Sequence, residues 1–91
     1  MNKYLAEFLG TLFLVFIIFA TGNWIAIGIG LAIPVLLAGP ISGGAFNPAV
    51  AISLYAAGKL SKADLIPYII VEILGGLTAF FLYNKFVNKN K

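Results

Sequence analysis

The longest stretch without a charged residue runs from Phe8 to Gly58, where 51 consecutive residues include no Asp, Glu, Lys or Arg. As one helix this stretch would be about 76 Å long, whereas the apolar interior of a bilayer is about 30 Å thick. Because 62% of the 91 residues are apolar and only 10% are charged, a water-soluble domain of this size could not bury its apolar surface. The sequence therefore predicts an all-α membrane protein whose charge-free stretch folds back on itself.

Glycine, asparagine and proline divide the chain into separate spans. Gly22-Asn23 and Gly39-Pro40 are the expected breaks, because glycine and proline both disfavour a continuous helix. We expect transmembrane spans at about 4–21, 24–38 and 64–84, and a re-entrant loop and half-helix at about 41–57. The chain is thus expected to be a multi-pass integral membrane protein, with the identity of the membrane left open.

A secretory signal peptide is the alternative interpretation of the first span, since Lys3 precedes an apolar run. Glu7 at the start of that run, and equally apolar residues after Gly22, favour a membrane span instead. Aromatic residues near the expected span ends predict belts at the membrane surface: Tyr4, Trp24, Tyr68 and Tyr83. Small residues four positions apart predict closely crossing helices: Ala6 with Gly10, Ala26 with Gly30, Gly28 with Ala32, and Gly75 with Ala79.

The segment from residue 41 to 58 is expected to turn within the membrane. Gly43 and Gly44 permit a sharp turn, Asn47 is a good N-cap, and Pro48 is favoured at the first helical position. A helix of about ten residues from Pro48 would be about 15 Å long, which is half a bilayer. Non-helical backbone at that depth is tolerated only when it is buried or lines a water-filled cavity, so a wet path is implied. A surface loop with an amphipathic helix is the alternative, although no polar face is offered by Val50, Ala51, Ile52, Leu54, Tyr55, Ala56 and Ala57.

Composition leaves few groups for catalysis or for metal binding. The chain contains no cysteine and no histidine, and its carboxylates are Glu7, Asp64 and Glu72. We therefore expect no enzyme activity, no metal site and no cofactor. The six positive residues are all lysine and are scattered along the chain, which argues against a nucleic-acid partner and favours helix ends at lipid headgroups.

The sequence SGGAFNPAV at residues 42–50 resembles the first Asn-Pro-Ala loop of the aquaporin family, the major intrinsic proteins. AEFLGT at 6–11, AIGIGLA at 26–32 and LIPYIIVEILGG at 65–76 resemble the family's first three helices, in order. The family fold consists of two such units, inverted relative to each other, whose half-helices meet at the bilayer centre. The resemblance implies that residues 1–91 form one aquaporin-like half: three transmembrane helices plus one re-entrant half-helix.

This resemblance implies a passive channel for water and small neutral solutes such as glycerol. Because the chain holds one unit, either it pairs with a second copy of itself or it is an inactive fragment. Three spans place the termini on opposite sides and divide the lysines evenly, with Lys3, Lys59 and Lys62 on one side and Lys85, Lys89 and Lys91 on the other. An even division gives little orientation preference, which favours an antiparallel homodimer, and the family resemblance suggests further assembly to an octamer.

The resemblance also implies which residues form the pore. The expected pore-lining and selectivity positions are Asn47, Pro48, Ala49, Val50, Gly43, Gly44, Ala45, Phe46, Ile27, Val35 and Leu14. Val50 stands where the second loop of the family typically has arginine, so we expect an apolar mouth that is less selective than that of a strict water channel.

Two glutamates are expected to support the loop. Glu7 matches a glutamate of the family's first helix whose carboxylate accepts hydrogen bonds from the loop. Glu72 stands where the family commonly has glutamine, so it is an acceptor, a protonated donor or a titrating group. The last option keeps open an alternative function, a dual-topology proton-coupled exporter of small molecules that uses Glu7 or Glu72.

Overall fold

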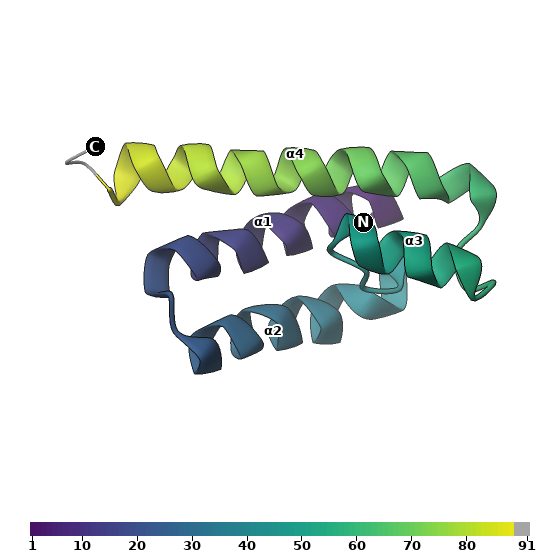
Figure 1. The fold of residues 1–91 in the computed structure, drawn as a ribbon, viewed down its shortest axis with the longest axis horizontal. Coiled ribbons are helices and arrows are strands. Elements are labelled where there is room, and N and C mark those ends of the chain that lie inside the picture. Colours follow the sequence, from purple (N-terminus) through teal and green to yellow (C-terminus); the bar gives the residue numbers. More distant parts are fainter. Residues whose placement is uncertain (89–91) are drawn as a thin grey trace.

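The computed structural model describes residues 1–88. Its helices are α1 (Lys3–Thr21), α2 (Trp24–Ser42), α3 (Pro48–Ala56) and α4 (Lys62–Phe86). α1 lies between α2 and α4 and contacts both, while the short α3 packs against α4 near the start of that helix (Figure 1). The molecule measures 44 × 23 × 23 Å along its principal axes. Its long axis therefore suits the thickness of a bilayer with its headgroups, about 40–45 Å.

Polar side chains cap the start of each described helix and satisfy backbone N–H groups that have no partner within the helix. The capping residues are Asn2, Asn23, Asn47 and Ser61. α1, α2 and α4 are long and apolar enough to cross a membrane. The expected class, an all-α membrane fold with three long helices and one short one, is confirmed.

The second helix runs farther than expected. The predicted break at Gly39-Pro40 is wrong, because α2 continues to Ser42 and the Gly43 N–H donates to the Gly39 carbonyl at 2.7 Å. Tertiary hydrogen bonds hold the last turn of α2, because the Ser42 hydroxyl donates to Glu7 and the Ser42 carbonyl accepts from the Tyr68 hydroxyl. The left-handed turn that ends the helix lies at Gly43, where φ is 90°.

The other bounds differ from the expected ones by one or two residues. α3 ends at Ala56, one residue before the expected position. α4 begins at Lys62 and ends at Phe86, two residues beyond the expected span at each end. These differences leave the order of the elements unchanged.

Small residues let α1 approach its neighbours closely. A Cβ on Gly75 of α4 would lie 2.6 Å from the Phe8 carbonyl oxygen of α1, and one on Gly30 of α2 would lie 3.1 Å from Ile17. Gly28 has no neighbour within 4 Å of the same position, so the predicted packing face at Gly28 and Ala32 is wrong and points outward. The sequence spacing identified helix faces but not which of them are covered.

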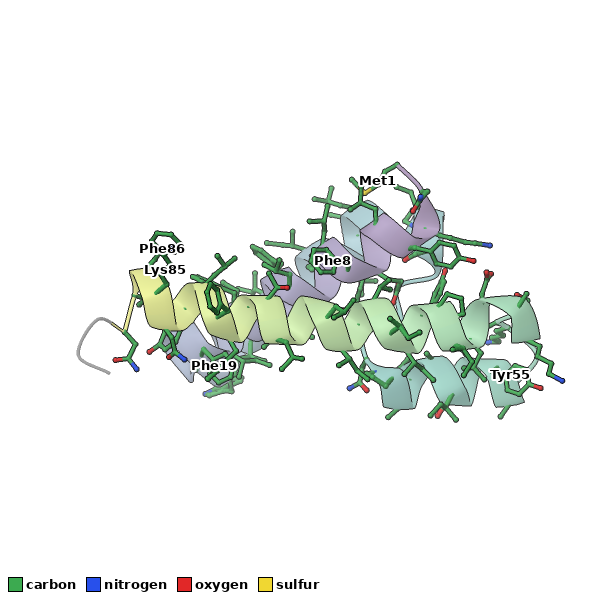
Figure 2. The ribbon with its side chains drawn as sticks, turned by 90° about the horizontal axis from the view of Figure 1, so that it is seen from above. Met1, Phe8, Phe19, Tyr55, Lys85 and Phe86 are labelled. Atoms are coloured by element: carbon green, nitrogen blue, oxygen red, sulfur yellow. The ribbon has the colours of Figure 1, made fainter. Side chains whose placement is uncertain are left out.

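The first turns of α1 and α4 are joined at one end of the molecule. Lys3 Nζ lies 2.7 Å from Asp64 Oδ2, and the Tyr4 hydroxyl donates to Asp64 Oδ1 at 2.7 Å. Lys85 lies at the opposite end from Tyr55, the penultimate residue of α3 (Figure 2). Lysines therefore occupy both ends of the bundle, although Lys89 and Lys91 lie outside the described residues.

Candidate functional site

Residues 43–47 join α2 to α3 as a tight, non-helical loop. Phe46 has a φ of 53°, a left-handed conformation that costs a side-chain-bearing residue on the order of 1–3 kcal/mol. Its ring is only 1% exposed and lies against Gly10, where any Cβ would overlap the ring atoms. Burial of the ring over Gly10 helps to offset the backbone strain and fixes the direction in which the chain enters α3.

The carboxylate of Glu7 holds this loop from the side of α1. Glu7 is fully buried, and its Oε1 accepts from the Phe46 N–H at 2.8 Å. Its Oε2 accepts from the Ala45 N–H at 3.2 Å and from the Ser42 hydroxyl at 2.6 Å. These three donors stabilise a charged carboxylate in an apolar setting. The carboxylate in turn satisfies two loop N–H groups that have no helical partner.

Two further residues of the loop support were missed by the sequence analysis. Ser42 accepts from the Gly44 N–H at 3.2 Å, and its carbonyl accepts from the Tyr68 hydroxyl at 2.6 Å. Tyr68 is 2% exposed, so its assignment to an aromatic belt is wrong. One signal was available in the sequence, because Tyr68 precedes Glu72 by four residues and therefore shares its helix face.

Asn47 caps α3 and presents its amide at the surface of this chain. Its Oδ1 accepts from the Ala49 N–H at 2.7 Å, and its side chain is exposed. No acceptor for its amide NH₂ lies within residues 1–88, so this donor faces outward. Because Asn47 stands at the N-terminus of a helix, the positive end of the helix dipole lies at the same point.

A hollow of about 360 Å³ lies beside Asn47, between α1 and α4. Five of the sequence-predicted residues line it: Leu14, Phe46, Asn47, Pro48 and Glu72. Thr11 was not predicted from the sequence, yet it lines the same hollow, and its hydroxyl is buried without a hydrogen-bond partner in the described part of the chain. The hollow therefore combines an apolar wall with the exposed amide and two buried polar side chains.

The other predicted pore residues lie outside this hollow. Val35 and Val50 are 43% and 41% exposed on this chain, and a Cβ on Gly44 would lie 3.7 Å from Val35. Ala49 and Gly43 are exposed as well, whereas Ile27 is half-buried. Ala45 is 3% exposed and packs with Ala51 and Tyr68, so its side chain belongs to the core and cannot line a pore.

The chain matches the family profile described as major intrinsic protein over residues 1–91. It is 45% identical to Glycerol uptake facilitator protein-like 6 of Lactiplantibacillus plantarum, over 97% of this chain and 45% of that protein. It is 38% identical to Aquaporin Z of Photorhabdus laumondii, over 87% of this chain and 41% of the relative. For Aquaporin AqpM of Methanothermobacter thermautotrophicus the identity is 32%, over 90% of this chain and 46% of the relative.

The chain thus spans less than half the length of these curated relatives. No solved structure matches it significantly.

Proposed function

This chain belongs to the major intrinsic protein family, and we propose that it forms a passive membrane channel for water and small neutral solutes by antiparallel pairing of two copies. Members of the family are channels rather than enzymes, and three long apolar helices make this chain a multi-pass integral membrane protein. Each copy would supply one half of the pore wall. Further assembly of such pairs to an octamer is part of the same proposal.

The observation that carries the proposal is the placement of Asn47. An exposed amide donor stands at the start of a half-length helix, where the helix dipole disfavours cations. α3 has nine residues and is about 14 Å long, so two such helices from opposite sides would meet near the bilayer centre. A single copy leaves this amide beside an open hollow, which a second, inverted copy would cover.

The relatives support the class of solute. Their names identify a glycerol uptake facilitator and aquaporins. An apolar mouth formed by Ile27 of one copy with Val35, Gly44 and Val50 of the other would admit neutral molecules of glycerol size. Ions would be opposed by desolvation in that mouth and by the two helix dipoles at the centre.

Antiparallel pairing predicts that the protein inserts in both orientations. A tag on the C-terminus should be accessible on both faces of the cell membrane in comparable amounts, because the lysines are balanced. Lys59→Gln and Lys85→Gln serve as paired controls. They should shift the ratio of the two membrane orientations in opposite directions. A single orientation above about nine parts in ten for the unmodified chain would contradict homodimeric pairing and favour a fragment or a different partner.

Installing a positive charge at the mouth should narrow the solute range. Val50→Arg is expected to lower the ratio of glycerol flux to water flux by on the order of tenfold, because the long side chain fills an apolar opening and about 1.4 kcal/mol of added barrier is tenfold in rate. Flux is measured by stopped-flow light scattering of proteoliposomes with and without glycerol. Val50→Met, which is long but uncharged, should change the ratio less. Exclusion of glycerol by the unmodified protein would show that the mouth is not wide and apolar.

A further inference from the structure

Glu72 is a buried carboxyl without a hydrogen-bond partner. It lies on α4 and is 1% exposed, and neither of its oxygens forms a hydrogen bond within the described residues. The Glu7 carboxyl and the backbone N–H of Asn47 are among the polar groups around it. An unpaired carboxylate at such a place would be strongly unfavourable, because it has lost the water that stabilises its charge.

The Ser42 hydroxyl and two loop N–H groups are already bound to Glu7, so the described donors left near Glu72 are the uncharged Thr11 hydroxyl and Asn47 N–H. Both oxygens of Glu7 act as acceptors, one for the Phe46 N–H and the other for Ser42 and Ala45. With three donors bound to it, Glu7 is the better acceptor of the two carboxyls, so a proton shared between them lies on Glu72. Ionisation of Glu72 would then place a second negative charge in the same apolar space, which is unfavourable.

No positively charged side chain is among the groups around Glu72 in residues 1–88, and the N-terminus of α3 at Asn47 supplies only a partial positive charge. From its own helix, Tyr68 is the nearest titratable side chain one turn away, and its hydroxyl proton is donated to the Ser42 carbonyl. α1 contributes Glu7, and the loop contributes no titratable group. Lys3, the first residue of α1, is paired with Asp64, two turns from Glu72.

We propose that Glu72 is held as a neutral carboxylic acid that donates its proton toward Glu7 and presents its carbonyl to the Asn47 N–H. In this form it offers one donor and one acceptor, as a glutamine amide would. An ionised Glu72 would offer acceptors alone and would face Glu7 with like charge. Glu72 is thereby a positioning residue, which acts on Asn47 directly and on the rest of the loop through Glu7.

Infrared spectroscopy of the purified full-length chain tests the protonation state. The unmodified protein should show the carbonyl stretch of a neutral carboxylic acid at neutral pH, and Glu72→Gln should remove it. Asp64→Asn is the matched control, because Asp64 is paired with Lys3 and its loss should leave the band in place. Absence of the band in the unmodified protein, or its persistence in Glu72→Gln, would overturn the proposal.

Hydrogen exchange of the loop tests the positioning role without any flux measurement, so its outcome is independent of the proposed channel activity. Glu72→Ala should speed exchange of the amides at residues 43–47 by about tenfold, since it removes the donor that steadies Glu7. Glu72→Gln should restore the slow exchange. Equal acceleration by both substitutions would show that the carboxyl itself is required, and it would contradict a neutral donor. If Glu72→Ala does not fold, the infrared comparison of the unmodified protein with Glu72→Gln still tests whether Glu72 is neutral.

Discussion

Asn47→Leu is expected to reduce water flux by about tenfold or more. The substitution removes the amide donor from both copies at the point where the two short helices meet. A water molecule that loses a hydrogen bond in a dry constriction faces a barrier higher by about 1–3 kcal/mol, and about 1.4 kcal/mol is tenfold in rate. Stopped-flow shrinkage of proteoliposomes with matched protein content measures the change.

This substitution also removes the N-cap of α3, so the loss of a cap must be separated from the loss of the donor. Ser61→Ala provides the control, because Ser61 caps α4 through the Asp64 N–H at 3.2 Å and lies away from the hollow. It should cost stability of about 1 kcal/mol and leave flux unchanged. Full flux through membrane-inserted Asn47→Leu protein would remove Asn47 from the pore.

Gly75→Ala is expected to separate α1 from α4. The added Cβ would lie 2.6 Å from the Phe8 carbonyl oxygen, 3.2 Å from Thr11 Cβ and 3.3 Å from the Leu12 nitrogen. Two of these three atoms belong to the backbone of α1, so no side-chain rotation relieves the clash. Overpacking of this kind costs about 1–3 kcal/mol or more, and we expect the thermal unfolding midpoint in detergent to fall by on the order of 10 °C.

Gly76→Ala is the matched control for that result. Its Cβ would meet Val15 Cγ2 at 3.7 Å, an ordinary contact, and both glycines gain the same helix propensity from alanine. We expect its midpoint to equal or exceed that of the unmodified protein. If the two variants unfold at the same temperature, the close crossing of α1 and α4 is not what limits stability.

Local sequence signals were sufficient to predict the half-helix. An asparagine cap followed by proline at the first helical position specifies where α3 begins, because both effects act within one turn. The charge-free stretch and its glycines likewise predicted the first two long helices, and the apolar run after Asp64 predicted the third. These features depend on neighbours in the chain, and the sequence contains them directly.

The end of α2 depends on contacts that are distant in the sequence. Pro40 suggested a break, but Ser42 is held in helical register by Glu7, 35 positions earlier, and by Tyr68, 26 positions later. Tyr68 was misplaced for the same reason, since its position near a span end does not reveal that its hydroxyl turns inward. Such tertiary bonds override local propensity and cannot be deduced from periodicity alone.

Much of the candidate site could be predicted from the Asn-Pro-Ala motif. The remaining residues could be placed only from the packing of the helices. Asn47, Pro48 and Leu14 were predicted and lie at one hollow, whereas Thr11 lies there without any signal of its own. Ala45 belongs to the same loop as Asn47, yet its side chain packs in the core with Ala51 and Tyr68 while its N–H donates to Glu7. Side-chain direction within a non-helical loop follows from φ and from such bonds, which sequence spacing does not encode.

The most direct test of the account is the water permeability of proteoliposomes that contain this chain and no other protein. If two copies complete a pore, vesicles should shrink under an osmotic gradient much faster than empty vesicles of the same lipid. The tag assay described above should find both orientations in the same preparation. Shrinkage no faster than that of empty vesicles, with both orientations present, would contradict the proposal that the chain forms a channel with itself.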